Sequence, residues 1–206
     1  MIIGIDEAGR GPLAGPVSAA SVILPDNFPF EILNDSKKMS PALRESVRHV
    51  ICKGAIAWGI GWASPAEIDE INILKASLLA MKRAFEIMMA HNPAEHYSGA
   101  LAVARGLEPP EAVVDGLYVP DISIPARAVV KADSKYPAVM AASILAKTAR
   151  DSMMEIYAVF YPEYGYDKHK GYPTASHRAA IAKYGPSPIQ RMTFTVKPLT
   201  QPVVQS

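Results

Sequence analysis

Four carboxylates in this sequence follow apolar runs that read as buried strands. Asp6 and Glu7 end the first run, Asp115 follows another and Asp133 a third. Ligands gather at the strand ends of an open α/β sheet, so these side chains are candidates for one site. Carboxylates without a Cys or His cluster suit hard cations such as Mg²⁺ or Mn²⁺ and do not suit zinc.

The number of acids bears on the chemistry. Mg²⁺ typically takes one or two protein carboxylates and fills its shell with water and phosphate oxygens. Four acids therefore predict either two ions, or one ion and one general base. Two ions about 3.5–4 Å apart can hold both the attacking and the leaving oxygen of a phosphodiester. The alternative for the amino-terminal pair is an exposed turn with two solvated acids.

Asp6 and Glu7 are adjacent, and neighbouring residues of a regular strand point to opposite faces. Both can face one ion only if the strand ends or bulges at Glu7. The glycines of the following loop, Gly9 and Gly11, would permit this. Otherwise Glu7 faces away and is structural, and the sequence leaves both possibilities open.

The elements that position the acids alternate between strand and helix patterns. This order predicts an α/β protein whose mixed sheet is flanked by helices on both faces. Apolar periodicity predicts strands at 2–5, 17–24, 55–63, 111–114 and 126–131, and helices at 41–52, 73–91, 137–160 and 175–184.

Three further expectations concern aromatic and histidine residues. Trp58 and Trp62 alternate with small residues and are expected in the core. The aromatic, basic stretch 161–173 is expected to be a loop. His169 and His177 flank it, and with no Cys nearby we expect them to be surface or loop residues.

The charge is balanced overall, with 21 Lys and Arg against 20 Asp and Glu, but it is uneven along the chain. From Arg127 onward there are eleven Lys and Arg against five Asp and Glu, a net charge of +6. A basic region beside an acid cluster suits a polyanion partner together with cations. Ordinary surface charge is the alternative.

The compartment can be inferred from what the sequence contains. Cys52 is the single cysteine, so no internal disulfide is possible, which fits a reducing compartment. Asp6 breaks the amino-terminal apolar run, which also lacks a basic segment, so we do not expect a signal peptide. The longest weakly polar stretch, 54–63, is too short to cross a bilayer. We expect a cytoplasmic protein with no membrane partner.

Six short motifs follow one another along the chain. They are DEAGRGP (6–12), NDSKK (34–38), DG (115–116), KADS (131–134), ASILAK (142–147) and HKGYPT (169–174). Together they resemble bacterial ribonuclease HII, and they occur in that family's order between residue 1 and about residue 197.

The resemblance implies an RNase H-like fold with a short helical carboxy-terminal extension. Residues 1–197 would form one catalytic domain including substrate-binding helices, followed by a tail at 198–206. The implied activity is cleavage of the RNA strand of RNA/DNA hybrids and incision at ribonucleotides embedded in duplex DNA. Two Mg²⁺ or Mn²⁺ ions would give 3′-hydroxyl and 5′-phosphate ends, and we expect the protein to act as a monomer.

The resemblance also implies roles for individual residues. The four acids, Asp6, Glu7, Asp115 and Asp133, match the family's catalytic metal ligands. The loop Gly9, Arg10 and Gly11 matches residues that read the ribose 2′-hydroxyl, and Tyr172 matches a tyrosine that stacks at the RNA–DNA junction. The remaining substrate-binding positions are Lys37, Lys38, Ser134, Ser143, Lys147, Lys170 and Arg191.

The residues themselves qualify some of these roles. Ser143, Lys147 and Asp151 share one face of the predicted helix. We expect Lys147 to be functional and Asp151 to be a salt-bridge partner. Tyr172 could instead pack against Tyr164 or Tyr166.

The chain departs from the family pattern at three places. Leu117 stands where Asn is expected, Thr193 stands where Ser is expected, and the stretch 92–110 looks longer than usual. None of these departures removes a predicted metal ligand.

Two other functions compete with the nuclease. An actin-like or sugar-kinase phosphotransferase could use Asp6 and the glycines after it, but that fold needs a second such half, and we find none. A nucleic-acid-binding module without catalysis would use the basic final third. It leaves the acids unexplained, because carboxylates repel phosphate unless metal ions are present.

Overall fold

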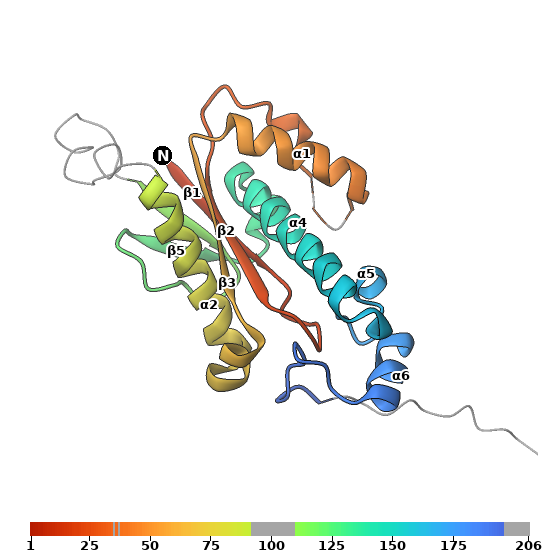
Figure 1. Ribbon diagram of the computed structural model, residues 1–206. Helices are drawn as coiled ribbons and strands as arrows, with labels where there is room; N and C mark the ends of the chain where they lie inside the picture. Colours follow the sequence, from red (N-terminus) through yellow and green to blue (C-terminus); the bar gives the residue numbers. More distant parts are fainter. Residues whose placement is uncertain (35, 37, 92–109, 196–206) are drawn as a thin grey trace, which may run out of the picture.

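The structure, a computed structural model, describes residues 1–34, 36, 38–91 and 110–195. Its centre is a five-stranded sheet in the order β3-β2-β1-β4-β5 (Figure 1). The pairs β1–β2 and β2–β3 are antiparallel, whereas β4 runs parallel to β1 and β5 parallel to β4. This confirms the predicted α/β class with a mixed sheet.

The elements follow the predicted order. The strands are β1 (Ile2–Ala8), β2 (Val17–Ile23), β3 (Ala57–Ala63), β4 (Glu111–Asp115) and β5 (Ala126–Val129). The longer helices are α1 (Pro41–Gly54), α2 (Pro65–His91), α4 (Pro137–Phe160) and α6 (Ala175–Tyr184). The shorter ones are η1 (Phe30–Ile32), η3 (Ala132–Ser134), η4 (Pro162–Tyr164) and α5 (Tyr166–His169).

Helix α2 covers one face of the sheet. Ile3 and Ile5 of β1 and Val114 of β4 point to this face, where they form a buried cluster with α2 residues such as Ala80 and Met88. Their spacing of two along β1 is the period with which strand residues share a face. The apolar residues of the two central strands therefore hold α2 in place.

Helices α4 and α1 cover the opposite face. Ala20 and Val22 of β2 pack with Leu145 of α4 and Ile51 of α1 in a second buried cluster. The first turns of α4 lie directly on β1, because a Cβ added at Gly4 would collide with the backbone of Ala138. A larger residue at position 4 would push α4 away from β1.

The start of α2 shows how local sequence sets a helix boundary. A capping box begins α2: Ser64 Oγ accepts a bond from the Glu67 amide at 3.2 Å, and Glu67 Oε2 accepts one from the Ser64 amide at 2.8 Å. Asn72 interrupts the helix with φ 68°, and its Oδ1 accepts bonds from the amides of Leu74 and Lys75. The predicted helix therefore begins where Asn72 caps the second part of α2.

Strand β3 corrects the expectation for the tryptophans. Trp58 is 37% exposed and Trp62 is half-buried, so neither lies in the core. The small residues between them are the ones that face α2. Added Cβ atoms at Gly59 and Gly61 would collide with the α2 backbone, so only small residues fit under this helix.

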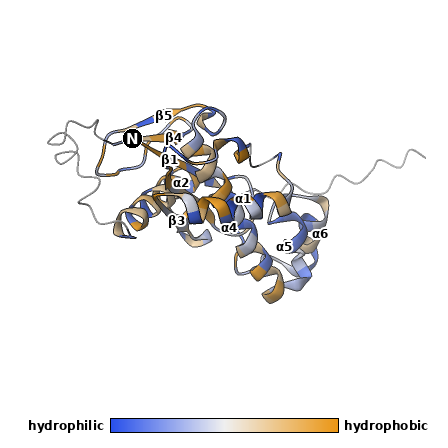
Figure 2. Cartoon of the chain, turned by 90° about the horizontal axis from the view of Figure 1, so that it is seen from above, coloured by the Kyte–Doolittle hydropathy of each residue, from blue (hydrophilic) through white to orange (hydrophobic). Residues whose placement is uncertain are grey.

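The carboxy-terminal extension packs on the last turns of α4. Figures 1 and 2 show α5 and α6 at the end of the molecule that lies far from β5. The predicted loop at 161–173 in fact contains η4 and α5. Buried rings explain this order, because Tyr164 and Tyr166 stack with their centroids 5.5 Å apart.

His169 and His177 were expected to be surface or loop residues, but both are buried, in α5 and α6. Their rings stack 4.5 Å apart. His169 Nδ1 accepts a bond from the Gly171 amide, so its Nε2 donates to the Tyr164 carbonyl. His177 Nδ1 donates to the carbonyl of Tyr172 at 3.0 Å. The pair therefore holds the backbone of the segment that carries Tyr172.

Some expectations lie outside the described residues. They include Lys37, the stretch 92–109 and the tail 198–206. Among the described residues, no helix has the length and apolar character needed to span a membrane.

The histidine pair predicts a loss of stability in mild acid. Burial lowers the pKa of both rings. The charge of a protonated His169 would lower the pKa of His177 further. Below about pH 6.5 the unfolded chain binds protons that the folded protein does not, so stability falls as the pH falls. Above that pH both rings are neutral in both states and nothing is lost.

We expect the melting temperature to drop between about pH 7.5 and about pH 5.5, by roughly 2–4 °C for each kcal/mol lost. His177→Asn keeps a donor for the Tyr172 carbonyl but does not titrate, so its melting temperature should drop less. Thermal melts of both proteins in buffers of equal ionic strength measure the difference. The same drop in both proteins would contradict the assignment to this pair.

Candidate active site

Three aspartates meet at one end of the sheet. Asp6 lies near the end of β1 and Asp115 ends β4, and the parallel pairing of Ile5 with Val114 sets the two acids side by side. Asp133 comes from η3, which follows β5. One carboxylate oxygen from each of the three aspartates lies within 4.8 Å of the others. The structure thus brings three of the four predicted acids together.

Backbone and hydroxyl groups hold these carboxylates. The amide of Glu7 donates to Asp6 Oδ1 at 2.7 Å, and the Ser143 hydroxyl also bonds to Asp6. The amide of Ala132 donates to Asp115 Oδ1 at 2.7 Å. Because Ala132 precedes Asp133, this bond fixes η3 against the end of β4.

The electrostatics of the cluster favour a bound cation. Burial raises the pKa of Asp6 well above its usual value, and the charges of Glu7 and Asp115 raise it further. The bonds from Ser143 and the Glu7 amide oppose this rise without cancelling it. Holding ionised acids this close costs free energy that a divalent cation would offset.

Glu7 occupies a different position from the three aspartates. Strand β1 continues in regular register to Ala8, so it neither ends nor bulges at Glu7. The side chain therefore starts on the opposite face from Asp6. Its Oε1 pairs with Arg10 Nη1 at 3.3 Å, and burial raises its pKa. The role of Glu7 as a metal ligand stays a prediction.

Glu7 nevertheless belongs to the same pocket as Asp6. Its Oε2 is buried and has no hydrogen-bond partner among the described residues. An unpaired buried carboxylate oxygen is costly, and a cation or its water would satisfy it. The pocket, called the acid pocket below, is lined by Asp6, Glu7, Ala8, Gly9, Arg10, Gly11, Ser36, Asp115, Ser143, Lys147 and Tyr172.

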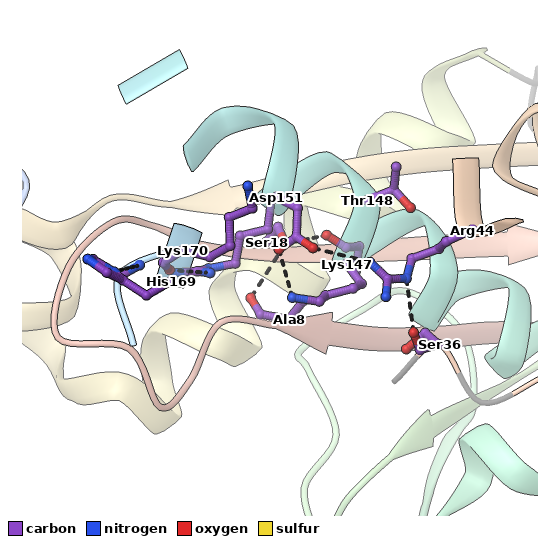
Figure 3. A network of polar contacts seen from close by, with 12 residues as sticks. Ala8, Ser18, Ser36, Arg44, Lys147, Thr148, Asp151, His169 and Lys170 are labelled. Carbon is purple, nitrogen blue, oxygen red and sulfur yellow. Dashed lines mark hydrogen bonds and ion pairs between the residues drawn. The ribbon is translucent and has the colours of Figure 1, made fainter. Parts of the chain in front are cut away.

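Helix α4 supplies a polar stripe to this pocket. Lys147 Nζ lies 2.7 Å from Asp151 Oδ1, and Arg44 Nη1 from α1 lies 3.2 Å from Asp151 Oδ2 (Figure 3). This confirms that Asp151 is a salt-bridge partner, and its partners are Lys147 and Arg44. The pairing orients the ammonium group of Lys147 along the wall of the acid pocket.

Ser36 and Arg44 were missed as parts of the site. The Ser36 hydroxyl lies 3.0 Å from that of Ser143, and Arg44 Nε donates to the Ser36 carbonyl at 2.9 Å. The motif NDSKK contained the signal for Ser36, because it is the one hydroxyl between the acid and the two lysines. Nothing in the sequence singled out Arg44.

Tyr172 stands at the mouth of the acid pocket. The side chain is 41% exposed, and its ring lies 5.9 Å from both Lys147 Nζ and the guanidinium carbon of Arg150. Tyr164 and Tyr166 stack on each other instead. The geometry therefore favours the alternative in which the ring of Tyr172 is presented to the pocket.

Other predicted substrate contacts lie away from the acid pocket. Lys38 is exposed and does not line it. Ser134 Oγ donates to the Lys131 carbonyl at 2.8 Å, which closes the turn of η3. Lys170 Nζ pairs with Glu155 Oε1 at 2.8 Å. Whether these side chains reach a bound substrate stays a prediction.

Arg191 differs most from its predicted position. Its side chain is fully buried, with 0% exposure, so it cannot contact a substrate directly in this structure. The guanidinium donates to five backbone carbonyls of the segment that follows β1. They belong to Gly9, Arg10, Pro12, Gly15 and Pro16.

Arg150 is a second buried cation, and sequence reasoning missed it. It donates to the carbonyls of Ala14, Pro16 and Lys170 at 3.0–3.2 Å. Burial lowers its pKa to about 10, and burial together with the nearby charge of Arg150 lowers that of Arg191 to about 9. Both side chains therefore remain charged at neutral pH.

A glycine is required where the chain passes Arg150. Gly9 has φ +99°, and an added Cβ would collide with the Arg150 side chain. The loop Gly9–Gly11 can therefore lie directly on the buried arginines.

Comparison with known proteins agrees with this geometry. A family model described as Ribonuclease HII matches residues 3–197. A relative named Ribonuclease HII from Treponema denticola is 54% identical over 202 residues, covering 97% of this chain and all of the relative. One from Dechloromonas aromatica is 46% identical over 194 residues, covering 94% of this chain and 90% of the relative.

A solved structure shows the same fold. The crystal structure of ribonuclease H2 from Pyrococcus horikoshii matches with a TM-score of 0.68 at 26% identity, covering 95% of this chain and 94% of that one. The family model and both relatives span nearly the whole chain. This chain therefore belongs to the ribonuclease HII family.

Proposed function

We propose that this protein is an endoribonuclease that hydrolyses the RNA strand of RNA/DNA hybrids with the help of divalent cations. The observation that carries the proposal is the set of three aspartates whose oxygens lie within 4.8 Å of one another, in a chain of the ribonuclease HII family. The phosphotransferase alternative is not favoured, because the family match spans residues 3–197.

Asp6, Asp115 and Asp133 would hold the cations, with Glu7 as a further ligand. The all-oxygen donor set and the unpaired Glu7 Oε2 fit Mg²⁺ or Mn²⁺. We propose that the acids hold two cations. Bound there, they would activate water and stabilise the charge that develops on the phosphodiester oxygens.

The chain's own groups would place the scissile phosphate. Lys147 lines the acid pocket, and its ion pair with Asp151 holds the ammonium group in one position. From there it can neutralise the charge of a phosphate oxygen. Ser143 bonds to Asp6 and orients that carboxylate. Attack by water with departure of the 3′-oxygen would give 3′-hydroxyl and 5′-phosphate ends.

Recognition of ribose would fall to Gly9–Gly11 and Tyr172. The 2′-hydroxyl is the one sugar group that differs from DNA, and it can both donate and accept a hydrogen bond. A Cβ placed on Gly11 would lie 3.7 Å from the ring of Tyr172, so the loop and the ring border the same part of the acid pocket. We propose that the ribose is read at this part of the pocket, which extends the activity to ribonucleotides embedded in duplex DNA.

The proposed organisation follows from the same arrangement. We propose that residues 1–197 act as one catalytic domain, with α5 and α6 contributing to substrate binding. A monomeric state and a cytoplasmic location remain predictions. A binding module without catalysis would not explain the three clustered aspartates, because carboxylates without metal ions repel a phosphate backbone.

The first prediction from the proposed function concerns the stability of the protein without metal. Asp6→Asn removes a buried carboxylate whose pKa is raised by burial and by the charges of its neighbours. The variant should therefore melt at a higher temperature than the wild type in EDTA at neutral pH. A raised pKa means that this cost appears as the pH rises above the usual value for Asp.

Adding Mg²⁺ should raise the melting temperature of the wild type more than that of Asp6→Asn, because the variant has less charge to neutralise. Asp121→Asn serves as the control, because Asp121 pairs with Lys82 at the surface away from the pocket. Equal shifts with Mg²⁺ in wild type and Asp6→Asn would argue against a cation at the aspartates.

The second prediction tests the reaction. The wild type should cleave an end-labelled RNA/DNA hybrid only when Mg²⁺ or Mn²⁺ is added, and leave 5′-phosphate and 3′-hydroxyl ends. Asp133→Asn should lower the rate by at least about 10²-fold, as expected for loss of a charge that stabilises the transition state. A 2′,3′-cyclic phosphate product would exclude water as the nucleophile and overturn the two-metal proposal.

The third prediction concerns Tyr172. Tyr172→Ala should lose more activity on a duplex with one embedded ribonucleotide than on a continuous hybrid, because stacking is worth roughly 1–3 kcal/mol. Tyr172→Phe keeps the ring and isolates the hydroxyl. The readout is the ratio of kcat/KM for the two substrates, with Trp58→Phe, at an exposed position on β3, as the control. Wild-type ratios in both Tyr172 variants would leave discrimination to Gly9–Gly11 alone.

A further inference from the structure

The loop Gly9–Gly11 has no regular secondary structure, yet its carbonyls are held by a single buried side chain. Arg191 Nη2 donates to the Gly9 carbonyl at 2.6 Å, and Nη1 donates to the Arg10 carbonyl at 3.0 Å. The same Nη1 reaches the Pro12 carbonyl at 2.8 Å. One planar guanidinium thereby fixes three of the four carbonyls of residues 9–12, which could otherwise rotate.

Fixing a carbonyl also fixes the amide of the next residue. In a trans peptide the C=O and the following N–H point in opposite directions. Because the Gly9 and Arg10 carbonyls point inward to Arg191, the amides of Arg10 and Gly11 point away from it. Both residues are exposed and line the acid pocket. Within the described part of the chain, neither amide donates to a protein acceptor.

The next amide shows that this orientation is used where a partner exists. The Pro12 carbonyl also points to Arg191, and the following amide, of Leu13, donates to the Gly171 carbonyl at 2.8 Å. Gly171 precedes Tyr172, so the arrangement also connects this loop to the tyrosine. The two remaining amides form a pair of donors directed at the side of the loop where a substrate would lie.

Arg191 is itself held on both sides. Its amide donates to the Leu13 carbonyl at 2.9 Å. Asp69, on the first part of α2, accepts bonds from the amides of Met192 and Thr193 at 2.8 and 2.9 Å and from the Thr193 hydroxyl at 2.6 Å. The turn that presents Arg191 is therefore tied to α2 as well as to the loop.

We propose that Arg191 is a positioning residue for sugar recognition: its buried guanidinium orients the amides of Arg10 and Gly11 as a pair of hydrogen-bond donors for the oxygen of the ribose 2′-hydroxyl. Its guanidinium donates to backbone carbonyls and does not contact a phosphate. The inference rests on the proposed ribonuclease function and adds to it the side chain that shapes the recognition loop.

A planar guanidinium is needed for this role. The two terminal nitrogens reach four carbonyls, while Nε donates to the Gly15 carbonyl at 2.9 Å. Lysine carries the same charge but offers one nitrogen on a flexible stem, which cannot hold separate carbonyls in fixed directions. Arg191→Lys therefore separates the geometry of the side chain from its charge.

The test measures whether Arg191 and the 2′-hydroxyl act through each other. The substrate is a DNA duplex with one embedded ribonucleotide, compared with the same duplex carrying 2′-fluoro at that sugar. Fluorine is a much poorer acceptor than a hydroxyl oxygen, so the wild type should show a large ratio of kcat/KM between the two. In Arg191→Gln this ratio should shrink at least about tenfold, and Arg191→Lys should shrink it as well.

A purely structural role would not change this ratio. Met88→Ala, a buried change on the α2 face of the sheet, serves as the control for lost stability. It should lower the melting temperature while leaving the 2′-hydroxyl to 2′-fluoro ratio at the wild-type value, because a smaller folded fraction reduces both rates equally.

A second variant keeps the test decisive if Arg191→Gln does not fold. Asp69→Ala loosens the turn that presents Arg191 and leaves the buried charge in place, so it should shrink the ratio in the same direction and by less. A wild-type ratio in every folded variant of Arg191 and Asp69 would overturn the proposal. A wild type that cleaves neither a hybrid nor an embedded ribonucleotide would instead overturn the proposed function.

Discussion

The parallel pairing of β1 with β4 is the constraint on which this site depends. It sets Asp6 beside Asp115 on the face that α4 covers, and the bond from the Ala132 amide then brings Asp133 to the same place. The arrangement is unfavourable in itself, because burial and neighbouring charges raise the pKa of Asp6. A sheet buried on both faces can hold acids in this way because its strands cannot separate to relieve the repulsion.

The segment that follows β1 explains why the carboxy-terminal extension packs against the amino-terminal part of the chain. Residues 9–16 leave β1 without regular structure, so their carbonyls need donors from elsewhere. Arg150 from α4 and Arg191 from beyond α6 supply them, which places the carboxy-terminal extension against the amino-terminal loop. The extension thus has two roles: it presents Tyr172 at the mouth of the acid pocket and it orders the loop on the other side.

Much of this could be predicted from the sequence, and the misses have a physical cause. Apolar periodicity located the strands, and the strand-end acids located the pocket, because both depend on local pattern. The positions of Trp58, His177 and Arg191 depend on tertiary packing. Glycines under α2 turned Trp58 outward, and stacking buried His177. Arg191 was expected to bind substrate, because nothing local shows that five carbonyls will surround it.

The net charge of the basic final third does not show what its cationic side chains contact. Its net charge of +6 suggested a surface for a polyanion. Yet Arg150 and Arg191 are buried against carbonyls, and Lys147 and Lys170 are paired with carboxylates. These cations order the protein around the pocket more than they attract a nucleic acid from a distance. In the proposed mechanism, selectivity for ribose would come from oriented backbone groups. The buried arginines fix the carbonyls of that backbone.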